Sequence, residues 1–278
     1  IKNPAVRSTD IAKSVGGDFG LALTGTPVEN RLSELWCIID TVHPGFLGAQ
    51  KDFEKKFEKP AIEDPKNAKA VKDFLETEVN SMPPKILRRM KEDHLKGLPK
   101  KHDHVMEEIM SDLQAETYKS LVIQAQTEQN TKKKTHGKTL ELLQQIRKIS
   151  LIPNQLQESG LTDELVENSA RLQKTIQILD KIYEKGEKAL IFLEFLDIQT
   201  ALLDYLQRRY SMPFPPQRIC GQTSASQRKT NIDNFQSSPE GNFQVMLLSP
   251  KAGGVGITLT AANHVIHLSR WWNPAVED

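Results

Sequence analysis

The sequence has little cysteine and no long hydrophobic run. Its two cysteines, Cys37 and Cys220, lie far apart in segments predicted to be structured, which favours two reduced thiols in an intracellular protein over a disulfide. No cysteines and histidines have the spacing of a zinc site, and His102 and His104 are interpreted as the solvated face of a predicted strand. No apolar run is long enough to span a bilayer. The N-terminus lacks the basic and then apolar pattern of a secretory signal, although truncation would remove such a segment.

An excess of one charge sign is missing as well. The chain has 37 lysines and arginines against 36 aspartates and glutamates, a net charge of +1. This balance argues neither for nor against nucleic-acid binding, which needs a local basic stripe and not a basic total. Basic clusters do occur, at Lys85, Arg88, Arg89 and Lys91 and at 132–134, but a charge run alone is more typical of solvated surface. The length of 278 residues suits one large domain or two of ordinary size.

From Ala170 onward, the sequence alternates between predicted helices and predicted strands. Apolar residues at helical spacing predict helices over 172–183, 198–206 and 224–235. The first of these ends at Gly186, and the last opens with a capping box formed by Ser224 and Gln227. Short apolar runs predict strands at 188–192, 218–220, 243–248 and 264–268. Strands that alternate with helices imply a parallel sheet covered on both faces.

The first half of the sequence is mostly helical in pattern. Apolar spacing predicts helices over 32–39, 68–75, 111–121 and 140–149. The first of them ends at His43, Pro44 and Gly45. Two strands are predicted, a buried one at 19–24 that ends at a turn at Gly25 and an alternating one at 101–109. Charged, polar or proline-containing stretches predict loops at 58–69, 127–138 and 153–162, the second of them mobile.

Six strings of the sequence carry a more specific pattern. They are IKNP at 1–4, LALTGTPVENRLSELW at 21–36, ILRRMKEDHLKGLPKKHDHV at 86–105, KALIFLEFLD at 188–197, ICGQTSASQR at 219–228 and VMLLSPKAGGVGITLTAANHVIHLSRWWNPAVED at 245–278. In this order and at this spacing they resemble the motifs of the Swi/Snf family of helicase-like ATPases, which are superfamily-two DNA translocases. The wording VENRLSELW looks most like the bacterial HepA/RapA-like members.

The resemblance implies an α/β fold of two RecA-like (P-loop NTPase-type) lobes, each a parallel sheet with helices on both faces. The expected division is the C-terminal part of the first lobe with a helical insertion at 1–101, a helical linker with the start of the second lobe at 102–168, and the second, helicase C-terminal lobe at 169–278. The phosphate-cradling pattern G-x-x-x-x-G-K-[ST] occurs nowhere, and the family's Asp-Glu box and final arginine motif are also missing. We therefore expect an internal segment of a longer motor, with its first lobe incomplete and its second truncated, that is inactive alone.

Two groups of residues are expected at the nucleotide. The run Thr24, Gly25, Thr26 and Pro27 resembles the family motif that couples the nucleotide state to lobe movement without carrying out hydrolysis. The alternative interpretation is an ordinary strand-ending turn in which Thr26 caps the next helix. The expected hinge and nucleotide-facing backbone is formed by Gly253, Gly254 and Gly256.

A third group is expected at DNA, and several of its members have a second interpretation. Arginines 88 and 89 suit an interlobe carboxylate as well as a phosphate, Ser224 suits a helix cap, Lys251 suits an acidic partner across the cleft, and the tryptophans suit burial as well as a DNA groove. Thr258 and Ser269 stand where the family commonly has Asn and Asp, so the polar network near Ser269 is expected to differ. The full set is Arg88, Arg89, Gly221, Thr223, Ser224, Lys251, Thr258, Trp271 and Trp272.

The function that the resemblance implies is part of an ATP-dependent double-stranded-DNA translocase or remodelling motor. ATP and Mg²⁺ are the expected cofactors of the intact protein, with none bound by this segment alone and no metal site of its own. Double-stranded DNA is the expected partner, through salt-dependent phosphate contacts, with a DNA-bound protein complex as a further candidate and no membrane. The expected location is the cytoplasm, at the nucleoid, in a bacterium and the nucleus in a eukaryote. Two alternatives stay open, a non-catalytic DNA- or protein-binding scaffold derived from such a motor and a strand-separating helicase of a neighbouring family.

Overall fold

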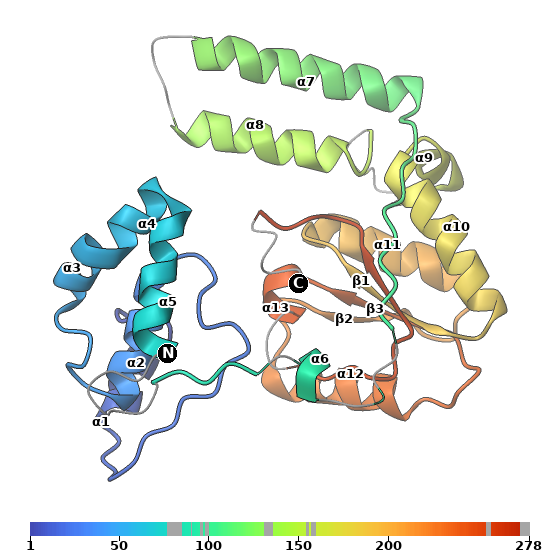
Figure 1. The fold of residues 1–278 in the computed structure, drawn as a ribbon. Helices are drawn as coiled ribbons and strands as arrows, with labels where there is room; N and C mark the ends of the chain where they lie inside the picture. Colours follow the sequence, from blue (N-terminus) through green and yellow to red (C-terminus); the bar gives the residue numbers. More distant parts are fainter. Residues whose placement is uncertain are drawn as a thin grey trace. The chain divides into compact units, whose positions relative to one another are not determined.

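The chain forms two units, residues 1–103 and 104–278. The computed structural model describes residues 1–76, 85–89, 91–94, 97, 100–130, 136–153, 156, 160–253 and 257–272 (Figure 1). Among these residues, no helix combines the length and apolar character needed to cross a membrane.

The described part of the first unit is built from helices. They are α1 (Arg7–Ser14), α2 (Leu32–Val42), α3 (Gln50–Phe53), a π-helical turn η1 (Glu54–Glu58), α4 (Lys59–Glu63), a 3₁₀ turn η2 (Pro65–Asn67), α5 (Ala68–Glu76) and α6 (Lys91–His94). Its core joins one face of α2 to α3 and α5 through Leu35, Trp36, Cys37, Ile39, Phe53, Val71 and Leu75. The Trp36 indole donates to the Gly48 carbonyl (3.1 Å), which satisfies the one polar atom of that side chain. The predicted helices over 32–39 and 68–75 are therefore confirmed.

Two predictions for the first unit are wrong. Residues 19–24 form neither a helix nor a strand, and Phe19, Leu21 and Leu23 are exposed. An apolar run forms a buried strand only where other strands and helices cover it, and the described part of this unit offers no strand for pairing. The predicted loop at 58–69 contains α4, η2 and the start of α5. Pro60 lies at the start of α4, directly after the π-helical turn η1, and the helical backbone continues through this proline.

The second unit contains a four-stranded, fully parallel sheet. Its elements are α7 (Asp112–Asn130), α8 (His136–Ile149), α9 (Asp163–Glu167), α10 (Ala170–Glu184), β1 (Lys188–Phe192), α11 (Leu196–Arg209), β2 (Gln217–Ile219), α12 (Ala225–Ser237), β3 (Gln244–Leu248), α13 (Pro250–Gly253) and β4 (His264–His267). The strand order is β2-β3-β1-β4, so β1 pairs with β3 on one side and β4 on the other. Each of the four predicted strands is confirmed to within about one residue at each end.

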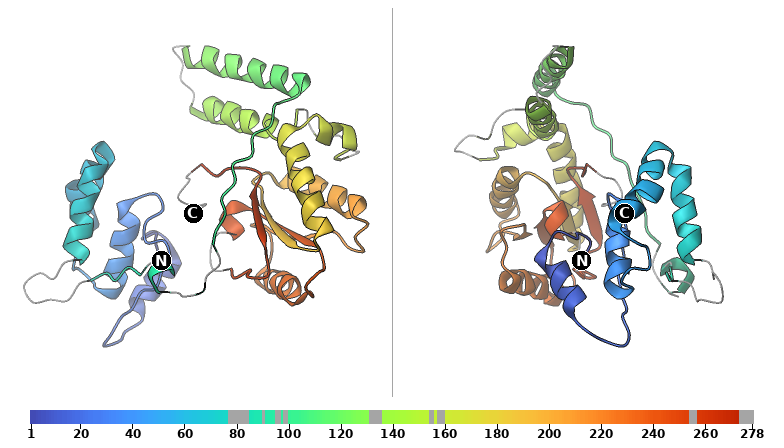
Figure 2. Two further views of the ribbon diagram at one scale, coloured as in Figure 1. Left: turned by 45° about the vertical axis from the view of Figure 1, so that its right-hand side comes forward. Right: turned by 90° about the vertical axis from the view of Figure 1, so that its left-hand side faces the viewer.

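Helices cover both faces of this sheet, as the sequence predicts. Ala189, Ile191, Val245 and Leu247 pack with the apolar faces of α10 and α11. Leu190, Met246 and Leu248 point to the other side, where they pack with Phe235 of α12 and Ile219. This alternation is the period of two that a strand imposes on its side chains. Figures 1 and 2 show α10 and α11 on one side of the sheet and α12 on the other.

The helices α7 and α8, which precede the sheet in the sequence, pack side by side as a hairpin (Figure 1). The predicted capping residue is confirmed, because the Ser111 hydroxyl accepts the Gln114 N–H (3.3 Å) at the start of α7. The predicted loop at 127–138 is wrong in part, since α7 continues to Asn130 and α8 begins at His136; residues 131–135 lie outside the described part of the chain. Polar composition indicated low burial there, and a helix that packs against its neighbour tolerates a polar outer face.

Two further predictions concern segments that flank the hairpin. The alternating segment 101–109 is extended and exposed and pairs with no described strand, so the predicted strand is wrong; alternation alone does not supply a partner. His102 and His104 are exposed within it, as expected. The predicted loop at 153–162 lies partly outside the described residues, and its described part contains no helix.

Candidate functional site

The carboxyl ends of the four strands bring most of the predicted site residues of the second unit to one edge of the sheet. Because all four strands are parallel, the segments that follow β1, β2, β3 and β4 leave the sheet on the same side. Gly221, Thr223 and Ser224 follow β2, Lys251 and Gly253 follow β3, and Trp271 and Trp272 follow β4. Parallel α/β sheets bind their ligands at this edge.

The turn between β2 and α12 is held by its own side chains. The Thr223 hydroxyl accepts the Cys220 N–H (3.0 Å), and the Thr223 N–H donates back to the Cys220 carbonyl (3.0 Å). Ser224 caps α12 by accepting the Gln227 N–H (3.2 Å), so the helix-cap interpretation of Ser224 is confirmed. Gly221 is exposed, and a Cβ atom there would meet nothing within 4 Å. The turn therefore presents the amino end of a 13-residue helix, where the helix dipole favours an anion.

Two opposing effects act on the pKa of the Cys220 thiol beside this turn. Burial by itself would raise the pKa of Cys220, but hydrogen bonds from Thr223 and Gln222 and the nearby Arg218 charge outweigh it, so that the pKa is lowered. The thiol is buried and reduced, as the sequence predicts.

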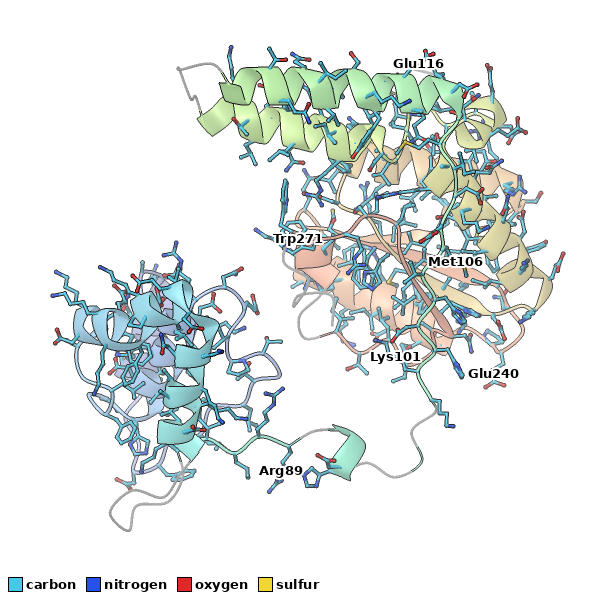
Figure 3. All side chains as sticks on the ribbon, turned by 45° about the horizontal axis from the view of Figure 1, so that its top comes forward. Arg89, Lys101, Met106, Glu116, Glu240 and Trp271 are labelled. Carbon is cyan, nitrogen blue, oxygen red and sulfur yellow. The ribbon has the colours of Figure 1, made fainter. Side chains whose placement is uncertain are left out.

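Lys251 and Trp271 connect the segment after β3 with the segment after β4. The exposed Lys251 ammonium lies 5.3 Å from the centroid of the Trp271 ring, within the range of a cation–π contact. Trp271 is half-buried at the edge of the second unit (Figure 3). Gly253 ends α13, whereas Gly254 and Gly256 lie outside the described residues. Thr258 is exposed.

Trp272 is the more exposed of the two tryptophans. Its exposed fraction is 46%, and the Arg147 guanidinium of α8 lies over its ring, with Cζ 4.1 Å from the centroid. Full burial of the tryptophan pair is thus ruled out. Ser269, which stands where the family commonly has Asp, is buried, and its hydroxyl accepts the Glu194 N–H (2.8 Å), which links the segments after β1 and β4.

A second polar cluster lies in the first unit, around the TGTP run. The Lys2 ammonium donates to the Thr26 hydroxyl (3.0 Å) and forms an ion pair with Glu29, and the Thr26 hydroxyl also lies 3.2 Å from Glu29 Oε1. The Thr24 hydroxyl accepts the Thr26 N–H (3.1 Å). Thr24, Gly25, Thr26 and Pro27 are all exposed. Thr26 does not cap the next helix, because α2 begins after Arg31 and no side chain caps its first residue.

Glu34 supports the same loop from α2. Its two carboxylate oxygens accept the backbone N–H groups of Glu29 (2.7 Å) and Asn30 (3.2 Å). Glu34 occupies the third helical position after Arg31, from which a capping-box glutamate reaches back to amides ahead of the helix. The sequence carried no capping-box signal for Glu34, because the N-cap residue is Arg31, and none for Lys2, which lies 24 residues before Thr26.

The stabilisation that the ion pair between Lys2 and Glu29 gives to the folded state depends on pH. The hydrogen bond from Lys2 lowers the pKa of Glu29, against the opposing effect of burial. A lowered pKa stabilises the folded state at pH values above the ordinary carboxyl pKa of about 4.3, and this contribution is lost as the pH falls through the folded value. Replacing Lys2 with methionine should therefore raise the pKa of Glu29 and cost below about 1 kcal/mol at neutral pH, but nothing in acid.

The direct measurement is an NMR titration of the Glu29 carboxylate. Lys51→Met is the matched control, because it removes an exposed lysine of the same unit that lies far from Glu29 in sequence. An unchanged Glu29 pKa in Lys2→Met would contradict the ion pair.

Arg88 and Arg89 are exposed on an extended segment ahead of α6, where Figure 3 labels Arg89. Both interpretations of this pair, phosphate contact and interlobe ion pair, stay predictions. Among the described residues, no group of three or more histidine, cysteine, aspartate or glutamate side chains is placed to hold a metal ion.

Comparison with known proteins bears on both units. Residues 1–155 match the model of the SNF2-related domain, and residues 171–278 match that of the helicase conserved C-terminal domain. Over its full length the chain is 36% identical to the "Uncharacterized ATP-dependent helicase MG018" of Mycoplasma genitalium and 34% identical to the "Zorya protein ZorD" of Escherichia coli, and it covers 25% and 26% of their lengths.

A solved structure shows the same fold. The chain is 29% identical, with a TM-score of 0.54, to the "Sulfolobus solfataricus SWI2/SNF2 ATPase core in complex with dsDNA", a match that covers 99% of this chain and 56% of that one. The expected RecA-like α/β fold is therefore confirmed. Because more than half of its residues match the SNF2-related domain and its four-stranded sheet lies within the match to the helicase C-terminal domain, the chain belongs to the SNF2 family of helicase-like ATPases.

Proposed function

We propose that this chain is the part of an ATP-dependent double-stranded-DNA translocase that follows the duplex and couples its movement to ATP hydrolysis. The relatives are named as an ATP-dependent helicase and as an ATPase core in complex with double-stranded DNA. The observation that carries the proposal is the carboxyl edge of the sheet, where Lys251, Trp271 and Trp272 lie on the same side as the amino end of α12.

These groups suit a DNA backbone. The amino end of α12 and the Lys251 ammonium both favour a phosphate, and the partly exposed indoles of Trp271 and Trp272 offer flat surfaces to a groove. Such contacts tolerate any sequence, release counterions and weaken as salt rises. Gly221, Thr223, Ser224, Thr258, Arg88 and Arg89 complete the proposed DNA-contacting set.

The TGTP run has a different proposed role. Lys2 donates to Thr26 within the run, and Glu34 on α2 accepts the N–H groups of Glu29 and Asn30 directly after it, so a displacement of the run would be passed to both. Gly253, with Gly254 and Gly256, is proposed to face the nucleotide. ATP hydrolysis requires positioning and electrostatic stabilisation of the transferred phosphoryl group, and in this proposal the intact protein supplies the phosphate-binding and Mg²⁺-binding groups from other residues. Strand separation is not part of the proposal.

The test uses the native full-length protein, with ATP hydrolysis measured with and without duplex DNA. We expect DNA to stimulate hydrolysis. DNA binding without hydrolysis would support a non-catalytic scaffold, and robust strand separation would support a helicase of a neighbouring family.

Lys251→Ala tests the interface itself. It should weaken binding to duplex DNA by about fivefold for every sequence tested, and reduce the slope of log K against log salt by about one. Lys185→Ala is the matched control, because Lys185 is an exposed lysine at the end of α10, three residues before β1 and thus near the opposite, amino edge of the sheet. Equal losses from the two variants would show that total charge, and not the carboxyl edge, governs binding.

A further inference from the structure

Arg147 joins the α7–α8 hairpin to the segment that carries the tryptophans. It lies near the end of α8, and its guanidinium meets three different partners. Cζ lies 4.1 Å from the centroid of the Trp272 ring, Nη2 donates to the Arg270 carbonyl, and Nη2 lies 2.6 Å from Glu194 Oε2. The side chains of Arg147 and Glu194 are only 21% and 16% exposed, so this ion pair is shielded from solvent.

The C-terminal end of α8, which carries Arg147, is held against α10 by hydrogen bonds. Gln114 is fully buried, and its side-chain amide donates to the Ile149 carbonyl at the end of α8 (2.8 Å) and accepts the Ala170 N–H at the start of α10 (3.1 Å). These two hydrogen bonds hold the end of α8 against the start of α10. Lys148, the next residue, forms a more exposed ion pair with Asp197 of α11, its side chain being 34% exposed, so this pair is expected to add little to the support.

We propose that Arg147 is a positioning residue that holds the Trp272 ring at the carboxyl edge of the sheet. One face of the indole rests on the guanidinium, and 46% of the residue stays exposed to an incoming ligand. A planar guanidinium can stack on an indole while it binds a carbonyl and a carboxylate, whereas a lysine ammonium is a point charge without a face. The DNA part of the proposal rests on the proposed function, because it requires Trp272 to contact duplex DNA; the placement of the ring does not.

Two substitutions on neighbouring positions separate positioning from charge. Arg147→Lys keeps the charge but removes the stacking plane, whereas Lys148→Ala removes a charge and an ion pair but leaves the plane. In the native full-length protein, with a Trp272→Phe reference to isolate the Trp272 emission, we expect Arg147→Lys to increase acrylamide quenching of Trp272 and Lys148→Ala to leave it unchanged. Unchanged quenching in Arg147→Lys would overturn the proposal.

A double-mutant cycle tests the DNA part. Arg147→Lys should weaken binding to duplex DNA by about fivefold, the size of one cation–π contact, and Lys148→Ala should change it less than about twofold. In a Trp272→Ala background, Arg147→Lys should cause no further loss, because it acts through that ring. Independent losses in the double variant would overturn the proposal. If Trp272→Ala alone leaves DNA binding intact, the proposed contact of Trp272 with DNA fails, while the quenching result still decides the positioning role.

Discussion

Replacing Gly186 with alanine is expected to destabilise the second unit by about 3 kcal/mol, of which about 1–2 kcal/mol comes from the left-handed backbone and the rest from overpacking. Gly186 has φ of +66° at the turn between α10 and β1. A Cβ atom there would lie 2.3 Å from the Gly241 carbonyl oxygen and 2.8 Å from its carbon. Both of these atoms belong to the backbone of the turn that precedes β3. The clash can therefore be removed only if the turns that contain Gly186 and Gly241 move apart.

Gly241→Ala provides the control for this prediction. Gly241 has φ of +81°, but a Cβ atom there would meet nothing within 4 Å, so only the backbone cost of about 1–2 kcal/mol applies. Hydrogen exchange of the β1 amides measures both variants within the unit that contains them. If the two substitutions cost the same, the close approach of the two turns is wrong.

Replacing Glu34 with alanine is expected to reduce DNA-dependent ATP hydrolysis by about 10- to 100-fold, because small displacements of positioning groups cost rates of this order. The carboxylate holds the backbone N–H groups of Glu29 and Asn30, directly after the TGTP run. Without it, the loop loses two charge-assisted hydrogen bonds, and Thr26 and Glu29 are no longer fixed relative to α2.

The readout is kcat for ATP in the native full-length protein with saturating duplex DNA. Glu63→Ala serves as the matched control, because it removes an exposed glutamate at the end of α4 in the same unit. An unaltered kcat in Glu34→Ala, with the fold intact, would remove the TGTP run from the proposed coupling mechanism.

The sheet of the second unit could be predicted from sequence because its signals are local. Each strand is a short apolar run between capping or turn residues. Ser224 begins α12 as an N-cap, and Gly186 follows the end of α10 with a positive φ, as their residue types predict. The errors arose where a local pattern lacked a partner. Residues 19–24 and 101–109 have strand-like patterns, but no described strand pairs with either segment.

For the candidate site, too, the sequence predicted the positions that depend on local signals but not the contacts between distant residues. The positions that follow β2, β3 and β4 were found because a parallel sheet places them at one edge. Their supports were not found, since Lys2 lies 24 residues from Thr26 and Arg147 lies 123 residues from Arg270. Contacts at such separation leave no periodic signature in one sequence.

The buried amide of Gln114 has a consequence for how the α7–α8 hairpin comes apart. At the base of the hairpin, this one side chain satisfies backbone groups of α8 and α10, whereas Ile123 of α7 and Leu140 of α8 are exposed farther along the two helices. Helices fray where few contacts hold them, so melting should start at the tip and stop short of Gln114. The base then unfolds only together with the sheet, and thermal motion at the tip leaves the Trp272 ring undisturbed.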